Sequence, residues 1–201
     1  MSGQDTRTVL LRRTYRGHID DVWDAITDPE RISRWFLPVT GDLRVGGHYQ
    51  TEGNAGGEIL HCEPPRLLRV TWVFGEVSPD DVNEVEIRLT PGGEDETHFE
   101  LEHVATVDDE RWAQYGPGAV GVGWELALLG LALHLEGGDI PAEEREAWGM
   151  SPQARAFMTR SAAAWGEAHQ AGGATEAEAT AAAAATTAFY APEPSEDQSG
   201  Q

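Results

Sequence analysis

The feature that most constrains this chain is a series of segments in which apolar and polar residues alternate, with short turns between them. In one segment Val85, Ile87 and Leu89 alternate with charged residues. Strands joined by short turns pair antiparallel, and this alternation gives a sheet one buried face and one solvated face. The pattern therefore predicts an antiparallel sheet. Its five segments are 43–49, 57–62, 68–74, 84–89 and 98–103.

Helices are predicted on both sides of these segments. Residues 8–15 read as a first strand, and 19–27 read as a short helix with one apolar stripe. Asp28 and Pro29 provide the cap and first residue of a second helix that ends near Leu37. After Asp109 the pattern changes to helix, with a first turn that contains Trp112 and Tyr115 and an interruption at residues 116–118. A long helix is then predicted to run to about Leu135, before a Gly-Gly pair. Sheet and helices in this order predict an α+β fold with helices on one face.

The long helix is apolar on every side, because Leu126, Leu129 and Leu133 lie away from the stripe of Leu128 and Leu131. Such a helix must be covered on two sides. We expect the cover to come from a helical extension at residues 139–191, packed within the same subunit or across a homodimer. Residues 192–201 are predicted to be a disordered tail. The covering side chains would be Trp148, Phe157, Trp165, Phe189 and Tyr190.

Composition excludes several classes of function. The formal net charge is −21, and every cation in the chain is arginine. Binding to nucleic acid or to an anionic membrane is not expected, because both need clustered cations. The absence of lysine excludes Schiff-base chemistry and a P-loop. The single cysteine, Cys62, is expected to be a buried thiol, and no signal peptide or membrane span is recognised, so a cytoplasmic location is expected.

The string VWDAITDPERISRWF at residues 22–36 resembles the start of SRPBCC (START-like) proteins of the activator of heat-shock-protein-90 ATPase homologue type. Similar family patterns follow in order over residues 8–135. The extension at 139–191 resembles a tail of actinobacterial members. The matching scaffold positions after residue 36 are Asp42, Leu43, Gly46, Gly47, Gly57, Ile59, Pro64, Pro65, Leu68, Trp72, Gly123, Trp124 and Leu128.

This resemblance implies a helix-grip domain over residues 1–138, in which a curved antiparallel sheet wraps around a long C-terminal helix. It also implies a cavity between sheet and helix. Members of the superfamily include binders of apolar molecules, polyketide cyclases and co-chaperone domains. Because one fold serves many functions, the site residues must decide among them.

The candidate cavity residues are aromatic or apolar, with one histidine. His103 shares a sheet face with Phe99 and Leu101 by alternation and could orient a ligand or act as a base; a buried structural histidine is the alternative. No histidine or cysteine spacing suggests a metal site, and no cofactor motif is present. The predicted lining is Trp72, Phe74, Phe99, Leu101, His103, Trp112, Tyr115 and Trp124.

Three functions remain open from the sequence. The first is binding of a small hydrophobic or aromatic molecule without catalysis, which needs apolar walls and few polar groups. The second is a cyclase or dehydratase activity that uses His103 or Tyr115 as acid or base. The third is a co-chaperone-like interaction with another protein, which would use a surface rather than a cavity.

Overall fold

The computed structural model describes residues 5–75, 78, 81–138 and 141–192. Its contacts divide the chain into two compact units. Unit 1 comprises Met1–Val107 and Ala127–Pro141, and unit 2 comprises Asp108–Leu126 and Ala142–Gln201. The long helix α4 (Gly118–Leu135) contributes its second half to unit 1 and its first half to unit 2. Of the tail predicted to be disordered at 192–201, only Pro192 lies within the described residues.

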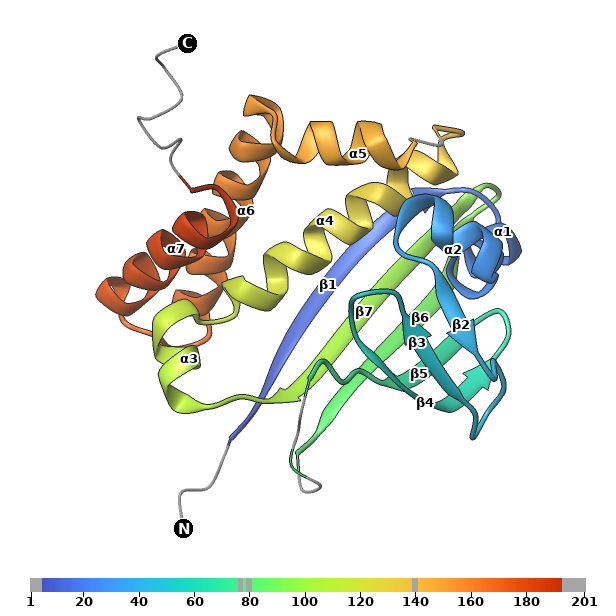
Figure 1. Cartoon of the computed structure of the whole chain (residues 1–201), viewed down its shortest axis with the longest axis horizontal. Helices are drawn as coiled ribbons and strands as arrows, with labels where there is room; N and C mark the ends of the chain where they lie inside the picture. The colour runs from blue at the N-terminus through green and yellow to red at the C-terminus, as the bar shows by residue number, and fades with distance from the viewer. Residues whose placement is uncertain (1–4, 76–77, 79–80, 139–140, 193–201) are drawn as a thin grey trace. The chain divides into compact units, whose positions relative to one another are not determined.

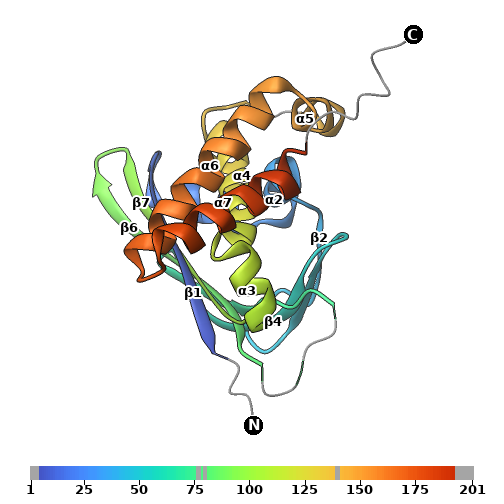
Figure 2. The ribbon, with the colours of Figure 1, turned by 90° about the vertical axis from the view of Figure 1, so that its left-hand side faces the viewer.

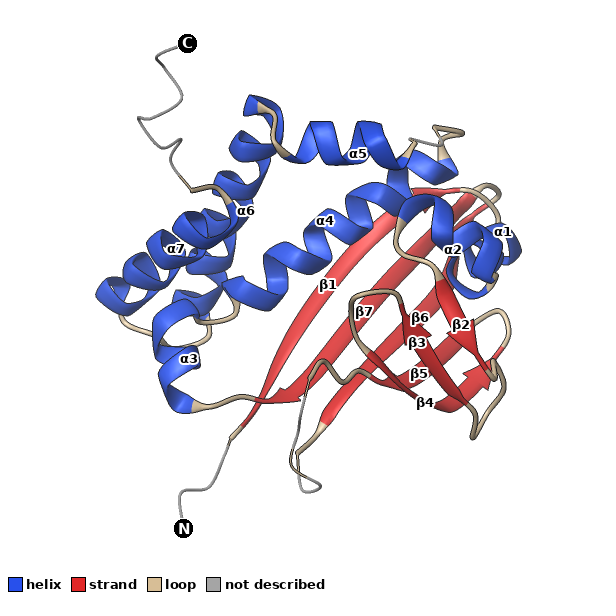
Figure 3. Ribbon diagram, in the orientation of Figure 1, coloured by secondary structure: helices blue, strands red, loops and turns tan. Residues whose placement is uncertain are grey.

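Unit 1 is built on a seven-stranded antiparallel sheet with the order β1-β7-β6-β5-β4-β3-β2 (Figure 1). The predicted α+β fold class is confirmed, and the arrangement agrees with a helix-grip (Figure 3). The strands are β1 (Thr6–Arg16), β2 (Val39–Gly41), β3 (His48–Thr51), β4 (Gly56–Glu63), β5 (Leu67–Thr71), β6 (Asn83–Gly93) and β7 (Glu96–Thr106).

Alternation sorts the side chains of this sheet onto two faces. On the inner face Leu89, Phe99 and Leu101 are almost fully buried. The second half of α4 covers this face, with Leu128 and Leu131 buried and the Tyr15 hydroxyl donating to the Leu128 carbonyl oxygen at 3.3 Å. The outer face carries the charged residues that alternate with the core positions, as the sequence pattern predicts.

Helices α1 (Ile19–Thr27) and α2 (Pro29–Trp35) follow β1, and their caps explain their bounds. The carboxylate of Asp28 accepts a hydrogen bond from the Arg31 backbone N–H at 2.9 Å, and Pro29 occupies the first helical position, which needs no N–H. Val22 and Ala25 are fully buried. The predicted apolar stripe therefore packs into unit 1.

Two local predictions were wrong. Residues 43–47 form a turn instead of the start of a strand, and Leu43 and Val45 are 42% and 52% exposed. Gly46 has φ +78°, a left-handed conformation that glycine adopts without strain and that turns the chain before β3. Cys62 is exposed and not buried, because it lies near the end of β4, beside Glu63 and the turn that follows.

Unit 2 contains α3 (Asp109–Tyr115), the first half of α4, α5 (Ala142–Gly149), α6 (Pro152–Ala171) and α7 (Glu176–Tyr190). Helices α6 and α7 lie side by side (Figure 2). Helix α7 begins with a capping box, in which Thr175 and Glu178 each accept a hydrogen bond from the other's backbone N–H.

The core of unit 2 joins α4 to the extension. Val122 of α4 is fully buried, and Gly121 faces the indole of Trp165, where an added Cβ would come within 2.1 Å. Phe189 is 63% exposed and stays outside this core. The core cluster consists of Val122, Ala154, Met158, Ala162 and Ala191, with Leu126, Trp148, Phe157, Trp165 and Tyr190 packed against it.

By length and composition α4 could cross a membrane. In the described structure, however, Val122 is buried in unit 2 and Leu131 in unit 1. Burial by protein on both halves is the environment of a core helix in a soluble-domain fold, and it explains why α4 has no polar side.

Candidate functional site

Four aromatic side chains form a continuous ladder in unit 1. Trp35 and Phe36 have ring centroids 5.7 Å apart, Phe36 and Trp72 are 6.3 Å apart, and Trp72 and Tyr49 are 6.4 Å apart. The ring planes differ by only 34–37° at each step. Such offset contacts are favourable for aromatic rings. Trp35, Phe36 and Trp72 remain half-buried, so part of the ladder is an accessible apolar surface.

The α2 end of the ladder is fixed by contacts inside unit 1. The Trp35 indole N–H donates to the Ala25 carbonyl oxygen at 2.9 Å. The Trp35 carbonyl oxygen lies against α4, where a Cβ added at Gly130 would come within 2.5 Å of it. A larger residue than glycine at position 130 would therefore move Trp35 and the adjoining Phe36.

The sheet end of the ladder depends on a glycine, Gly57, which has no side chain. Tyr49 pairs with Gly57, and a Cβ at Gly57 would lie 2.1 Å from the Thr71 hydroxyl oxygen. Because Gly57 has none, the Tyr49 hydroxyl reaches across β4 and donates to the Thr71 carbonyl oxygen at 2.7 Å. Burial raises the pKa of Tyr49, so this hydroxyl stays a proton donor. Trp72, the next residue, is then held beside the Tyr49 ring.

His103 is the polar group of the inner face. It pairs in register with Val9 and Val85 and is 7% exposed. Burial among apolar neighbours lowers the pKa of His103 to about 4, so the imidazole is neutral at physiological pH. Val85 also pairs with Val70, two residues before Trp72. From strand spacing and rise, His103 and Trp72 have Cα atoms roughly 12 Å apart.

The structure places the predicted lining residues in two separate groups. Phe99 and Leu101 are fully buried core residues of unit 1, with Phe99 packed edge-on against Tyr15 at 5.6 Å. Trp72 and His103 lie on the same inner face. Phe74 does not join them: the chain leaves β5 at Thr71, and Phe74 is 71% exposed.

The remaining predicted residues belong to unit 2. The Trp112 ring meets His169 of α6 edge-on at 5.4 Å, and the Tyr115 ring meets Phe189 of α7 at 5.9 Å. Trp124 is half-buried on α4. Tyr115 and His103, the two candidate acid–base groups, thus lie in different units.

Sequence reasoning missed Phe36 and Tyr49 as site residues. Trp35 and Phe36 fall in the family-like string and read as scaffold, although an aromatic pair directly after a short helix is a signal in itself. Tyr49 alternates with Gly47 in a segment for which the predicted strand began too early.

In the part of the chain that the structure describes, no group of three His, Cys, Asp or Glu side chains is arranged to hold a metal ion.

With this geometry in view, comparison with known proteins gives the family. Residues 17–136 match the family of activator of Hsp90 ATPase homolog 1-like proteins. The chain belongs to this family. The match covers α1, α2, strands β2 to β7 and all of α4, and therefore includes every residue of the aromatic ladder and His103. A search of curated proteins found no match.

Solved structures extend the comparison. CalU16 from Micromonospora echinospora is 38% identical, with a TM-score of 0.63 over 83% of this chain and 88% of that one. Residues 1–136 are only 136 of 201, about two thirds, so the similarity to CalU16 must include part of the extension. MLL2253 from Mesorhizobium loti is 26% identical, with a TM-score of 0.57 over 67% of this chain and all of that one.

A third neighbour is DynU16, a protein in the dynemicin biosynthetic locus. It is 26% identical, with a TM-score of 0.56, and the match covers 66% of this chain and 48% of that one. These neighbours, together with the family match, support the helix-grip fold.

Proposed function

We propose that this protein binds a small hydrophobic or aromatic molecule against the inner face of the unit 1 sheet, without catalysing a reaction. The observation that carries the proposal is the ladder from Trp35 to Tyr49, because it leaves half-buried ring surface along an otherwise buried sheet face. Ligand sites are mostly apolar with a few placed polar groups, and this surface has that character.

The ladder supports a flat ligand in particular. Its rings are spaced 5.7–6.4 Å apart with similar tilts, so a planar molecule could continue the stack over Phe36 and Trp72. His103 is the neutral polar group on the same sheet face, where it can set the orientation of a ligand. The Cα atoms of Trp72 and His103 are roughly 12 Å apart, a span suited to a molecule of two or three fused rings.

Two features favour binding over catalysis. A general base works best when its pKa lies near the working pH, and the pKa of His103 is lowered to about 4. The other candidate, Tyr115, packs edge-on against Phe189 within unit 2. DynU16 is described as a protein in the dynemicin biosynthetic locus, which is a reason to include biosynthetic products and their precursors among the molecules to test.

The test is native mass spectrometry of the purified full chain, with solvent extraction of anything that accompanies it. The wild-type protein should carry one apolar molecule per chain, or take one up from a panel of planar aromatics. Trp72→Leu should reduce this occupancy at least tenfold, and Trp148→Leu in unit 2 is the matched control. Equal uptake by both variants, or none by the wild type, contradicts the proposal. The same spectra report whether the chain is a monomer or the homodimer considered above.

A further inference from the structure

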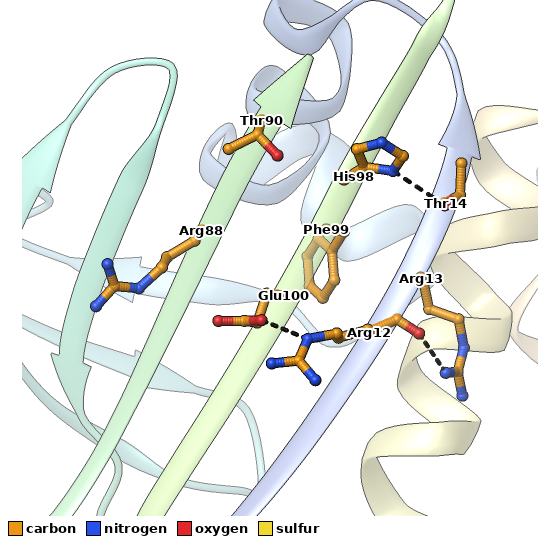
Figure 4. Close-up of a pocket in the computed structure, with 8 residues that line it drawn as sticks. All are labelled: Arg12, Arg13, Thr14, Arg88, Thr90, His98, Phe99 and Glu100. Carbon is orange, nitrogen blue, oxygen red and sulfur yellow. Dashed lines mark hydrogen bonds and ion pairs between the residues drawn. The ribbon is translucent and has the colours of Figure 1, made fainter. Parts of the chain in front are cut away.

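The outer face of the sheet carries a second feature that the proposed function does not use. A depression of about 430 Å³ lies over β1, β7 and β6, on the face that points away from the core (Figure 4). Most of its side chains come from the exposed positions of these strands. The lining residues are Arg12, Arg13, Thr14, Arg88, Thr90, His98, Phe99 and Glu100.

One cross-strand row in the depression places two arginines around a single carboxylate. Glu100 pairs in register with Arg12 on one side and with Arg88 on the other. Two strand spacings separate the Cα atoms of the arginines, which is about 10 Å. The Arg12 Nε donates to the Glu100 carboxylate at 2.7 Å, whereas Arg88 contacts Glu86. The contact through Nε leaves the terminal N–H groups of Arg12 available to a ligand.

The next row supplies hydroxyl groups. His98 pairs in register with Thr14 and Thr90, and its Nδ1 lies 3.2 Å from the Thr14 hydroxyl oxygen. The imidazole occupies the space over Gly92, where a Cβ would lie 2.8 Å from its Nε2. Figure 4 shows these side chains on the same face of the sheet, with the Arg12 guanidinium beside the Glu100 carboxylate, His98 beside Thr14, and the Arg88 side chain directed away from Arg12.

We propose that this depression binds a phosphate group, carried by a phosphate monoester. Arginine forks match phosphate oxygens bidentately, and hydroxyl groups add further donors. A tetrahedral dianion can use both guanidinium groups and the Thr14 and Thr90 hydroxyls together, because it has three terminal oxygens. A planar carboxylate has two oxygens and half the charge. Each arginine already has a carboxylate partner, Glu100 for Arg12 and Glu86 for Arg88, so a bound phosphate would share these guanidinium groups with the two glutamates.

The test uses inorganic phosphate and phenyl phosphate as probes, titrated at constant ionic strength into the full chain. Arginine Nε–H resonances in ¹H–¹⁵N NMR spectra give the readout. We expect the Arg12 and Arg88 resonances to shift and saturate, with a lower dissociation constant for phenyl phosphate than for acetate. Arg88→Gln should weaken binding about tenfold, the loss expected for a charge-assisted hydrogen bond.

Two further variants separate a built site from general surface charge. Arg69→Gln is the matched control, because Arg69 also faces outward on this sheet beside a glutamate but lies outside the depression. It should leave phosphate binding within twofold of the wild type. Glu100→Gln should tighten binding about threefold by removing a nearby negative charge. The proposal is overturned if Arg69→Gln weakens binding as much as Arg88→Gln, or if acetate shifts the same resonances equally well.

Discussion

His103 gives the structure a specific dependence of stability on pH. It is 7% exposed on the inner face of β7, and burial lowers its pKa from 6.5 to about 4. Between these two values the unfolded chain binds a proton that the folded chain does not. Stability from this residue is therefore fully present above about pH 6.5 and is lost as the pH falls toward 4.

The size of the effect follows from the shift. One pKa unit corresponds to about 1.4 kcal/mol, and a shift from 6.5 to about 4 implies a loss of about 2 kcal/mol between pH 8 and pH 5. The loss would approach about 3 kcal/mol below pH 4. Such a loss is a large fraction of a typical unfolding free energy of about 5–15 kcal/mol.

Urea unfolding of the wild type and of His103→Gln at a series of pH values from 8 to 5 measures this term. The wild type should lose about 2 kcal/mol more than the variant over this range, because glutamine does not titrate. His98→Gln, on the exposed face of the same strand, is the control for removing a histidine from β7. Parallel pH profiles for the wild type and His103→Gln would refute the reasoning.

Three further predictions concern packing and capping, each measured by chemical or thermal unfolding. Leu131→Ala removes a fully buried side chain from the second half of α4 and should lower the unfolding free energy of unit 1 by about 3 kcal/mol. A decrease below about 1 kcal/mol would mean that α4 does not pack there as described. Gly121→Ala should destabilise unit 2 by about 1–3 kcal/mol, because the new Cβ would clash with Trp165. Gly149→Ala is the control: its Cβ would meet nothing within 4 Å, so the unfolding free energy should not change. Thr175→Ala removes the capping box of α7 and should cost about 1 kcal/mol, with an unchanged melting temperature counting against the cap.

The sequence predicted those parts of the fold that depend on local patterns. Helix α1 was placed at its observed bounds, because its apolar stripe falls within its nine residues. Strands β6 and β7 were predicted from strict alternation. Alternation failed at Leu43 and Val45, since it does not distinguish a strand from a tight turn, and here the chain turns at Gly46. Helix α5 was not predicted as a separate helix of the extension, because Trp148 is its single large apolar residue, which leaves no stripe to detect.

The candidate site was only partly predictable. The alternation of apolar and polar residues along the strands predicted that the side chains of His103 and Trp72 point to the inner face. The contact between Tyr49 and Trp72 could not be foreseen, because it crosses β4 and depends on Gly57 having no side chain. The outer depression has the same origin, because Arg12 and Arg88 are 76 positions apart and come to flank Glu100 in one cross-strand row only through the order and register of β1, β7 and β6.

The most direct test of the proposed binding surface is an NMR titration of the seven tryptophan indole N–H resonances with 2-naphthol. A ring stacked on the ladder would shift the signals of Trp35 and Trp72, whose side chains flank Phe36. Our account predicts saturable shifts for these two resonances and small ones for Trp148 and Trp165 in the core of unit 2. Uniform, non-saturating shifts of all seven signals, or saturation that spares Trp35 and Trp72, would contradict it.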